Sequence, residues 1–206
     1  MTLKIIVEKL ARSSKKIITS GEIKEDCKEL KMDYYTTIRY LTHYKYLSRI
    51  LKGIFYVYSI EERKLKKVDM SFYDILAEAL KLKGIKNWYF GLETALKLNN
   101  MTHEYFTVDF IMNDKIFRAK PIPIMGRKVK FYKVKPKLLS FGIKKERYIY
   151  SDPEKTAIEL VYLKHYGELE FEEIAENLSK EKIVRYSKNY DSRKIKPLLK
   201  AQQQKS

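Results

Sequence analysis

The strongest constraint on the fold is the spacing of apolar residues near the N-terminus, which is helical at first and then changes to a strand pattern. Apolar residues recur three or four positions apart in three stretches, one near the start, one after Ser20 and one after Asp33. This spacing places them on one face of a helix, and Ser20 and Asp33 are residue types that cap helix N-termini. In the third helix we expect Ile38, Leu41 and Tyr44 to face the core.

The strand pattern that follows predicts a β-hairpin. Two apolar runs, Leu47–Leu51 and Ile54–Tyr58, stand on either side of a Lys52-Gly53 turn. Three helices followed by a hairpin predict a winged helix-turn-helix, in which a helix enters the major groove of duplex DNA and a basic hairpin holds phosphates. We therefore predict a DNA-binding domain over residues 1–62.

The face of the third helix that points away from the core is the predicted contact surface for DNA. Its polar side chains can donate hydrogen bonds to phosphates or base edges, and an arginine can bind a guanine through two hydrogen bonds. Two further basic residues belong to the hairpin. The alternative is a module that only contacts other proteins and whose charges are solvated. The predicted DNA-binding residues are Thr36, Thr37, Arg39, Tyr40, His43, Arg49 and Lys52.

The rest of the chain predicts a mixed α/β domain over residues 69–206, so that the whole chain is α+β. The charged run Glu61–Lys67 has few apolar residues and is predicted to be the linker. Helices are predicted after Ser71 and at Asp152-Pro153-Glu154, where a capping residue precedes a proline in the first helical position. The strand-like segments between them predict a small, mostly antiparallel sheet, and further helices are expected over residues 170–200.

A strongly basic segment lies within the predicted sheet. Residues 118–147 contain 11 Lys or Arg and one acid, a net charge of +10. The lysines change phase at Phe131-Tyr132, which predicts a β-bulge or a strand exposed on both faces. Lysine also protects edge strands, but so large a charge favours a surface that binds nucleic acid or an acidic protein. The predicted surface residues are Arg127, Lys128, Lys130, Lys133 and Lys135.

The charge of the whole chain also favours a polyanionic partner. Lys and Arg total 43 against 26 Asp and Glu, so the formal net charge is +17. The chain starts without the pattern of a signal peptide, has no apolar run long enough to span a membrane, and contains one cysteine, Cys27. We therefore expect a cytoplasmic protein without a membrane partner.

Few residues are arranged for catalysis. The histidines His43, His103 and His165 lack metal-binding spacing, and one cysteine cannot make a thiolate zinc site. A glycine-rich phosphate-binding motif is absent from the sequence. A metal-dependent nuclease would need clustered acids near a lysine such as Lys120, and no acid lies two residues before it. We expect a protein that is not an enzyme and uses no metal or cofactor.

Three segments carry a resemblance to a known family. They are Tyr46–Val57, Tyr89–Leu96 and Ser151–Leu163, which with their spacing span nearly the whole chain. The chain resembles the AbiE-type (abortive-infection) antitoxins, also called type IV toxin–antitoxin regulators. The resemblance implies an N-terminal winged helix that represses its own operon. It also implies a C-terminal domain that counteracts a nucleotidyltransferase-like toxin made by the neighbouring gene.

The resemblance assigns DNA-contact positions in the first domain and shows one departure from the family pattern. The glycine usual between recognition helix and wing is replaced by Lys45-Tyr46. The residues that match the groove and wing positions are Thr37, Arg39, Tyr40, Arg49 and Lys52.

The combined prediction is a DNA-binding antitoxin and transcriptional autoregulator. Its expected partners are duplex DNA of its own promoter and the neighbouring gene's toxin, acted on directly or indirectly. The basic surface of the second domain is expected to bind this toxin or nucleic acid. Two alternatives remain open. One is a winged-helix transcription factor whose second domain senses a ligand, and the other is a nuclease or RNA-binding protein that uses the basic segment.

Overall fold

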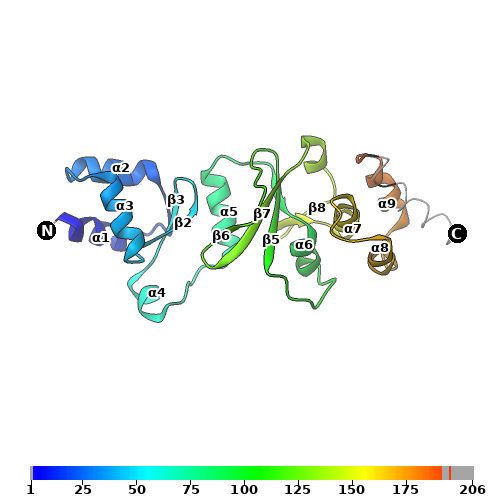
Figure 1. Cartoon of the computed structure of the whole chain (residues 1–206), viewed down its shortest axis with the longest axis horizontal. Helices are drawn as coiled ribbons and strands as arrows, with labels where there is room; N and C mark the ends of the chain where they lie inside the picture. The colour runs from blue at the N-terminus through cyan, green and yellow to red at the C-terminus, as the bar shows by residue number, and fades with distance from the viewer. Residues whose placement is uncertain (1, 192–194, 196–206) are drawn as a thin grey trace. The chain divides into compact units, whose positions relative to one another are not determined.

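The chain folds into two compact units. A computed structural model describes residues 2–191 and Ile195. The first unit comprises Met1–Lys86 with Ile124–Gly126, and the second comprises Asn87–Pro123 with Arg127–Ser206. Figure 1 colours the chain by residue number, from blue at the N-terminus to red towards the C-terminus. The elements of the first unit are α1 (Thr2–Arg12), β1 (Ile17–Thr19), α2 (Ser20–Glu29), α3 (Tyr34–His43), β2 (Leu47–Leu51), β3 (Ile54–Val57), α4 (Ile60–Leu65) and α5 (Phe72–Leu82).

The first unit contains a three-stranded antiparallel sheet in the order β1-β3-β2. The predicted hairpin is confirmed, with Leu47 opposite Val57 and Arg49 opposite Phe55. Each fully buried Leu, Ile or Phe stabilises such a core by about 1.5–3 kcal/mol relative to an exposed side chain. The buried core residues shared by α1, α2, α3 and the sheet are Ile6, Leu10, Ile18, Ile23, Cys27, Leu41, Leu47, Phe55 and Val57.

Side-chain caps fix where the helices of the first unit begin. Asp33 caps α3 as predicted, because its carboxylate accepts a hydrogen bond from the Thr36 backbone N–H at 2.7 Å. The predicted start of α2 is off by one residue. Thr19 is the cap there, and it forms a capping box with Glu22.

The predicted linker is wrong, because the segment is folded into the first unit. Ile60–Leu65 forms α4, and Ser59 caps it in a capping box with Glu62. The Glu62 carboxylate is fully buried and accepts hydrogen bonds from Tyr56 Oη at 2.5 Å and Lys16 Nζ at 2.8 Å. A charged residue within an apparently solvated run therefore anchors the segment.

The helix predicted after Ser71 also belongs to the first unit. It forms α5, which contacts all three strands of the small sheet. The contacts come from an apolar stripe that includes Leu76 and Leu80, both with 0% exposure. The boundary between the units therefore follows Lys86, later than the predicted boundary at residues 62–69.

The second unit is built on a six-stranded sheet in the order β6-β7-β5-β4-β9-β8. The prediction of a mostly antiparallel sheet is wrong, because β5 pairs parallel with β7, and β4 pairs parallel with β9. Residues 114–126 join β5 to β7, and roughly a dozen residues suffice for such a crossover. The last residue of β6, Ile124, is counted with the first unit. The elements of the second unit are β4 (Trp88–Phe90), α6 (Leu92–Leu98), β5 (Val108–Asn113), β6 (Ile122–Ile124), β7 (Arg127–Lys133), the 3-10 helix η1 (Pro136–Leu139), β8 (Ile143–Lys145), β9 (Ile149–Ser151), α7 (Pro153–Tyr162), α8 (Glu168–Ala175) and α9 (Lys180–Ser187).

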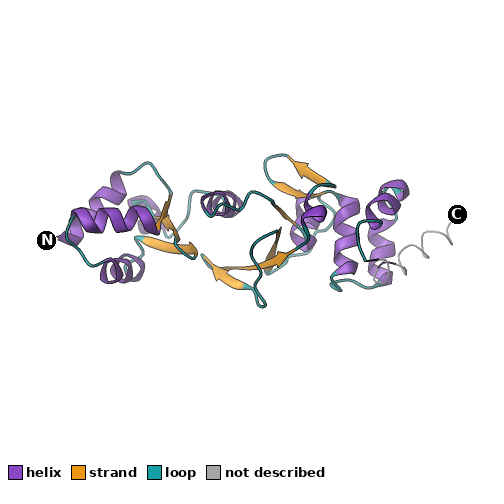
Figure 2. Ribbon diagram, turned by 90° about the horizontal axis from the view of Figure 1, so that it is seen from above, coloured by secondary structure: helices purple, strands orange, loops and turns teal. Residues whose placement is uncertain are grey.

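The helical part of the second unit begins as predicted. Asp152 caps α7 by accepting a hydrogen bond from the Lys155 backbone N–H at 2.9 Å, and Pro153 takes the first helical position. Both α8 and α9 pack against α7 (Figure 2). The predicted helices over 170–200 are thus found in part, and residues 192–194 and 196–206 lie outside the described residues.

The chain is α+β, with one small antiparallel sheet and one larger mixed sheet. Over residues 2–191, no helix combines the length and the apolar character that crossing a bilayer requires.

Candidate nucleic-acid interface

The face of α3 that joins the core differs from the predicted face. Thr37 and Leu41 are buried, and Tyr34 and Ile38 are partly buried, so the inward stripe follows the i, i+3, i+4, i+7 spacing of a helix. Thr37 was predicted to face DNA and is 1% exposed. Its hydroxyl donates to the Asp33 carbonyl at 2.7 Å, so its polar group is used within the helix.

The prediction that Tyr44 is a core residue is also wrong. Its side chain is 53% exposed, because α3 ends at His43 and the chain turns before the stripe can continue. Lys45 makes this turn in the left-handed region, with a φ of 54°. That conformation favours glycine and costs another residue roughly 1–2 kcal/mol.

The outward face of α3 carries polar and aromatic side chains. Thr36, Arg39 and His43 are exposed as predicted. Tyr40 is half-buried because its ring packs on Tyr46, with the ring centroids 6.1 Å apart. Three of the five helix residues predicted to contact DNA are therefore fully available, Tyr40 is available in part, and Thr37 is not.

Sequence reasoning missed Tyr35, the most exposed aromatic residue described in the first unit. Its side chain is 75% exposed in the first turn of α3. The neighbouring Tyr34 holds it in place from the core side, with the two rings edge to face at 5.2 Å. The signal available in the sequence was its position two residues after the cap Asp33, at the helix end that contacts bases in helix-turn-helix proteins.

The hairpin presents the two predicted basic residues at its surface. Arg49 and Lys52 are both exposed. The turn between the strands requires glycine, since Gly53 has a φ of 79° and an added Cβ would lie 2.9 Å from Ser20 Oγ. This turn therefore holds Lys52 at a defined place beside the start of α2.

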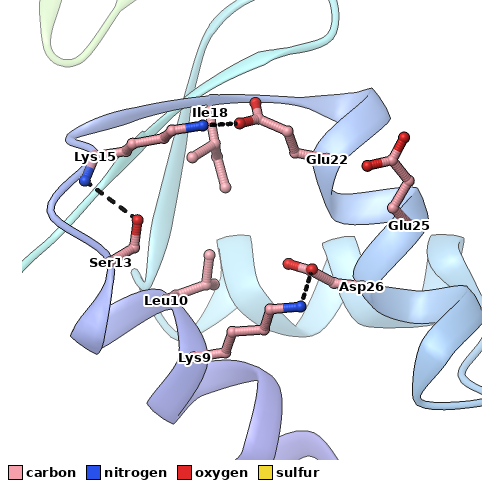
Figure 3. Close-up of a pocket in the computed structure, with 8 residues that line it drawn as sticks. All are labelled: Lys9, Leu10, Ser13, Lys15, Ile18, Glu22, Glu25 and Asp26. Carbon is pink, nitrogen blue, oxygen red and sulfur yellow. Dashed lines mark hydrogen bonds and ion pairs between the residues drawn. The ribbon is translucent and has the colours of Figure 1, made fainter.

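A pocket of about 200 Å³ opens beside α1 and α2 (Figure 3). Lys9 Nζ lies 2.5 Å from Asp26, and Lys15 Nζ lies 2.7 Å from Glu22. Hydrogen bonds to Asp26 and Glu29 raise the pKa of Lys9 to about 12. Four charged side chains of the pocket are thus committed to ion pairs that fasten α2 to the chain before it. The lining residues are Lys9, Leu10, Ser13, Lys15, Ile18, Glu22, Glu25 and Asp26.

The basic strand β7 of the second unit pairs regularly with β5, so of the two predicted structures, a bulge or a strand exposed on both faces, the bulge is not found in this pairing. It pairs with β5 in continuous register from Val108 opposite Lys128 to Asn113 opposite Lys133. Val129 and Phe131 are buried on one face. Lys133 lies on the same face of β7 as Val129 and Phe131, which are buried. Because Lys133 is the last residue of the strand, its side chain reaches solvent, and this explains why the lysine alternation shifts there.

Two of the five predicted surface residues make interactions within the second unit. Arg127 pairs with the buried carboxylate of Asp109 at 2.7 Å. Lys130 donates to the carbonyls of Arg118 and Ala119, at 2.7 and 2.5 Å. The exposed cations of this surface are Lys128, Lys133 and Lys135.

The fold brings together a histidine and two partners that the sequence does not connect. His165 Nδ1 lies 2.7 Å from Glu93 Oε1, and His165 Nε2 lies 3.0 Å from Tyr132 Oη. A catalytic nucleophile needs an activating base or a lowered pKa. Burial, and then the charge of Glu93, raise the pKa of Tyr132 instead. The geometry therefore suits a role in joining α6, β7 and the segment after α7.

A second buried polar cluster surrounds Lys155, whose side chain has no exposure. Its Nζ donates to the carbonyls of Leu138 and Phe141, and it lies 3.8 Å from Glu159 Oε1. Burial lowers the pKa of Lys155 and raises that of Glu159, and each charge partly offsets the shift of the other. This cluster fastens α7 to η1. No group of three or more metal-ligand side chains gathers anywhere in the described part of the chain.

Comparisons with known proteins give a likeness to a solved structure. No protein-family model and no curated protein sequence matches the chain. Among solved structures, the RV2827C protein from Mycobacterium tuberculosis is similar, with a TM-score of 0.60 and 14% sequence identity. The alignment covers 95% of this chain and 74% of that chain. At this identity the likeness shows a shared fold and nothing about function.

Proposed function

We propose that this protein is a DNA-binding antitoxin that represses its own promoter and counteracts a nucleotidyltransferase-like toxin. In this proposal the first unit contains a winged helix-turn-helix, with α3 as recognition helix and the β2–β3 hairpin as wing. The observation that carries it is the exposed face of α3, which combines Tyr35, Thr36 and Arg39 and is followed along the chain by a hairpin with the exposed Arg49 and Lys52.

The proposed mechanism divides the contacts between bases and phosphates. The first turns of α3 would enter the major groove, where Arg39 can bind a guanine through two hydrogen bonds and Tyr35 can pack on base edges. Arg49 and Lys52 would hold phosphates beside the groove, which fixes register and makes binding depend on salt. This arrangement uses no metal or cofactor.

A titration of the promoter duplex tests the DNA proposal. We expect Arg39→Ala to weaken binding by about 1–3 kcal/mol while the fold survives, because the side chain is exposed. The matched control is Lys4→Ala, which removes an exposed charge from α1. Equal affinity of Arg39→Ala and Lys4→Ala for the promoter would overturn the assignment of α3.

The antitoxin role is assigned to the second unit and its exposed lysines. Lys128, Lys133 and Lys135 are exposed cations of one basic segment, which favours an acidic protein or nucleic acid as the partner. The test is co-expression with the toxin of the neighbouring gene. We expect the triple change to Gln to fold normally and to lose growth rescue, whereas Lys145→Gln, an exposed lysine of β8, keeps it. Full rescue by the triple variant would remove these lysines from the mechanism.

A further inference from the structure

The second unit contains a groove of about 700 Å³ beside the end of β7. This volume lies in the range that accommodates small molecules or single nucleotides. One wall is the loop that follows β5, and the other is the chain that runs from β7 into η1. The lining residues are Asp114, Phe117, Lys133, Val134, Lys135 and Pro136.

Phe117 is held in place although its ring is exposed. Asn113, which is fully buried, bonds the loop from below: its Nδ2 donates to the carbonyls of Ile116 at 3.0 Å and Tyr132 at 3.1 Å. Its Oδ1 accepts a hydrogen bond from the Lys115 backbone N–H at 2.9 Å. The loop therefore leaves β5 in a fixed conformation.

Lys130 holds the same loop on its other side. Its Nζ bonds to the carbonyls of residues 118 and 119, and lies 5.7 Å from the centroid of the Phe117 ring. The Arg118 backbone N–H donates to the Phe131 carbonyl at 3.3 Å. Phe117 is thus 56% exposed on a loop that is bonded at both ends. An apolar ring presented to solvent in this way is ready to stack on a planar partner.

The two lysines of the groove are available to a ligand. Lys133 and Lys135 are exposed and have no ion pair or side-chain hydrogen bond within the described part of the chain. The Asp114 carboxylate accepts one hydrogen bond from Asn87 Nδ2 at 2.9 Å. Its other oxygen is buried and has no partner among the described residues, which is uncommon for a buried acceptor.

These groups together match the chemistry of a nucleotide. Aromatic side chains stack on bases, and lysines along a groove bind the phosphates of single strands. A carboxylate accepts hydrogen bonds from the amino group of a base. We propose that this groove binds single-stranded nucleic acid, with a base stacked on Phe117 and the flanking phosphates on Lys133 and Lys135. The proposal goes beyond duplex recognition by the first unit and does not depend on it.

An acidic peptide fits the groove less well. It could pair with Lys133 and Lys135, but the Phe117 ring would gain no planar partner. A simple anion such as inorganic phosphate would likewise use the lysines alone. The exposed aromatic ring of Phe117 distinguishes a nucleotide from these ligands.

The test is a fluorescence anisotropy titration of the full chain with labelled eight-nucleotide single strands of RNA and of DNA. An excess of unlabelled duplex is present to compete for general electrostatic binding. We expect Phe117→Ala to bind about 5- to 150-fold more weakly, the range given by removal of one stacked base. Phe117→Trp keeps a stacking ring and should retain the affinity. Tyr105→Ala is the matched control, because it removes an aromatic ring that is 86% exposed and outside the groove.

The lysines are tested through the salt dependence of the same titration. Changing Lys133 and Lys135 to Gln should reduce the slope of log K against log salt by about 0.7 for each phosphate that the protein no longer binds. Lys145→Gln should leave the slope unchanged. Arg39→Ala should weaken duplex binding and leave single-strand binding intact, so failure of the proposed duplex site and failure of this groove give different results.

Three results would overturn the proposal. Equal single-strand affinity of Phe117→Ala and Tyr105→Ala, with both proteins folded by circular dichroism, would show that the ring does not stack on a base. An unchanged salt slope in the lysine variant would show that Lys133 and Lys135 do not bind phosphates. Binding of free ATP or GTP as tight as that of the single strands would assign the groove to a free nucleotide instead.

Discussion

The two units each bury a glutamate against tyrosine hydroxyls, and yet the two carboxyl groups respond to burial in opposite directions. In the first unit, hydrogen bonds to Glu62 outweigh the effect of burial and hold its pKa at about 2. In the second unit, burial dominates and raises the pKa of Glu159. Each accepts a hydrogen bond from a tyrosine at 2.5 Å, from Tyr56 and Tyr89 respectively, so the tyrosine does not account for the difference.

The number of donors accounts for the direction at Glu62. Besides Tyr56, its two oxygens accept hydrogen bonds from Lys16 Nζ at 2.8 Å and from the backbone N–H groups of Ser59 at 2.8 Å and Asp69 at 2.9 Å. Lys16 itself is 39% exposed and keeps part of its hydration. Donors that already point at the carboxylate favour its ionised form.

Glu159 accepts fewer hydrogen bonds than Glu62, and burying its cationic partner costs more desolvation free energy. It accepts from Tyr89 and from Tyr190, the latter at 3.0 Å, but its second oxygen has no partner among the described residues. Its amine partner Lys155 is 3.8 Å away and fully buried, so both ions of the pair lose their water. A buried pair of this kind can cost more in desolvation than the attraction returns. The comparison shows that several donors together outweigh burial at Glu62, whereas burial dominates at Glu159, where the donors are fewer.

The largest effect should come from removing one ion of the buried pair. We expect Lys155→Ala to destabilise the second unit by about 3–5 kcal/mol, because Glu159 and the carbonyls of Leu138 and Phe141 lose their buried donor. The single tryptophan, Trp88, lies in the second unit and reports its unfolding in urea by fluorescence. A loss below about 1 kcal/mol, similar to a Lys145→Ala control, would show that this pair contributes little.

A smaller effect is expected from Glu62→Gln in the first unit. The amide cannot accept from all the donors that surround the carboxylate and would leave some of them buried without a partner. We expect a loss of about 1–3 kcal/mol. Amide hydrogen exchange along β3 measures it, since this strand opens with the first unit. Unchanged exchange in the variant would contradict the role given to the donors.

The pH dependence of stability in the wild-type first unit tests the role of Glu62 without a mutation. The pKa of Glu62 in the fold lies below its ordinary value of 4.5, so the ionised carboxylate stabilises the fold fully above that pH. Protection of β3 should therefore decrease as the pH falls from 4.5 towards 2. Glu62→Gln should lack this decrease, and an equal decrease in both proteins would assign the effect to other acids.

The smallest effect is expected from Glu159→Gln. Burial already disfavours the charge of this group, and an amide oxygen can still accept from Tyr89 and Tyr190. We expect a change of about 1 kcal/mol or less in the urea titration. Because the folded pKa is raised, wild-type stability should fall as the pH rises above 4.5, and the variant should lose that slope. A cost larger than that of Glu62→Gln would reverse the comparison.

Local signals in the sequence predicted the elements whose ends they specify. The Asp33 cap, the Lys52-Gly53 turn and the Asp152-Pro153 helix start are all found where they were predicted. Each depends on residues within three or four positions of one another, and backbone geometry alone makes them recognisable.

Interactions between distant residues could not be predicted in the same way. Glu62 stands in a charged run, and only its contacts with Lys16 and Tyr56 show that the run is folded. His165 and Glu93 are 72 positions apart in the sequence and form a hydrogen bond in the fold. The parallel pairing of β5 with β7 depends on the crossover path, which hydrophobic periodicity does not describe. Of the candidate site, the exposed face of α3 was predicted, but not the inward turn of Thr37.

The single cysteine can report how often the first unit opens. Cys27 is 2% exposed in the core shared by α1, α2 and α3, so a thiol reagent can reach it only when that core opens. The rate of alkylation under native conditions therefore measures how often the first unit opens. A ligand that binds this unit only in its closed state must slow the reaction, so duplex DNA could be detected by protection of a thiol it never touches.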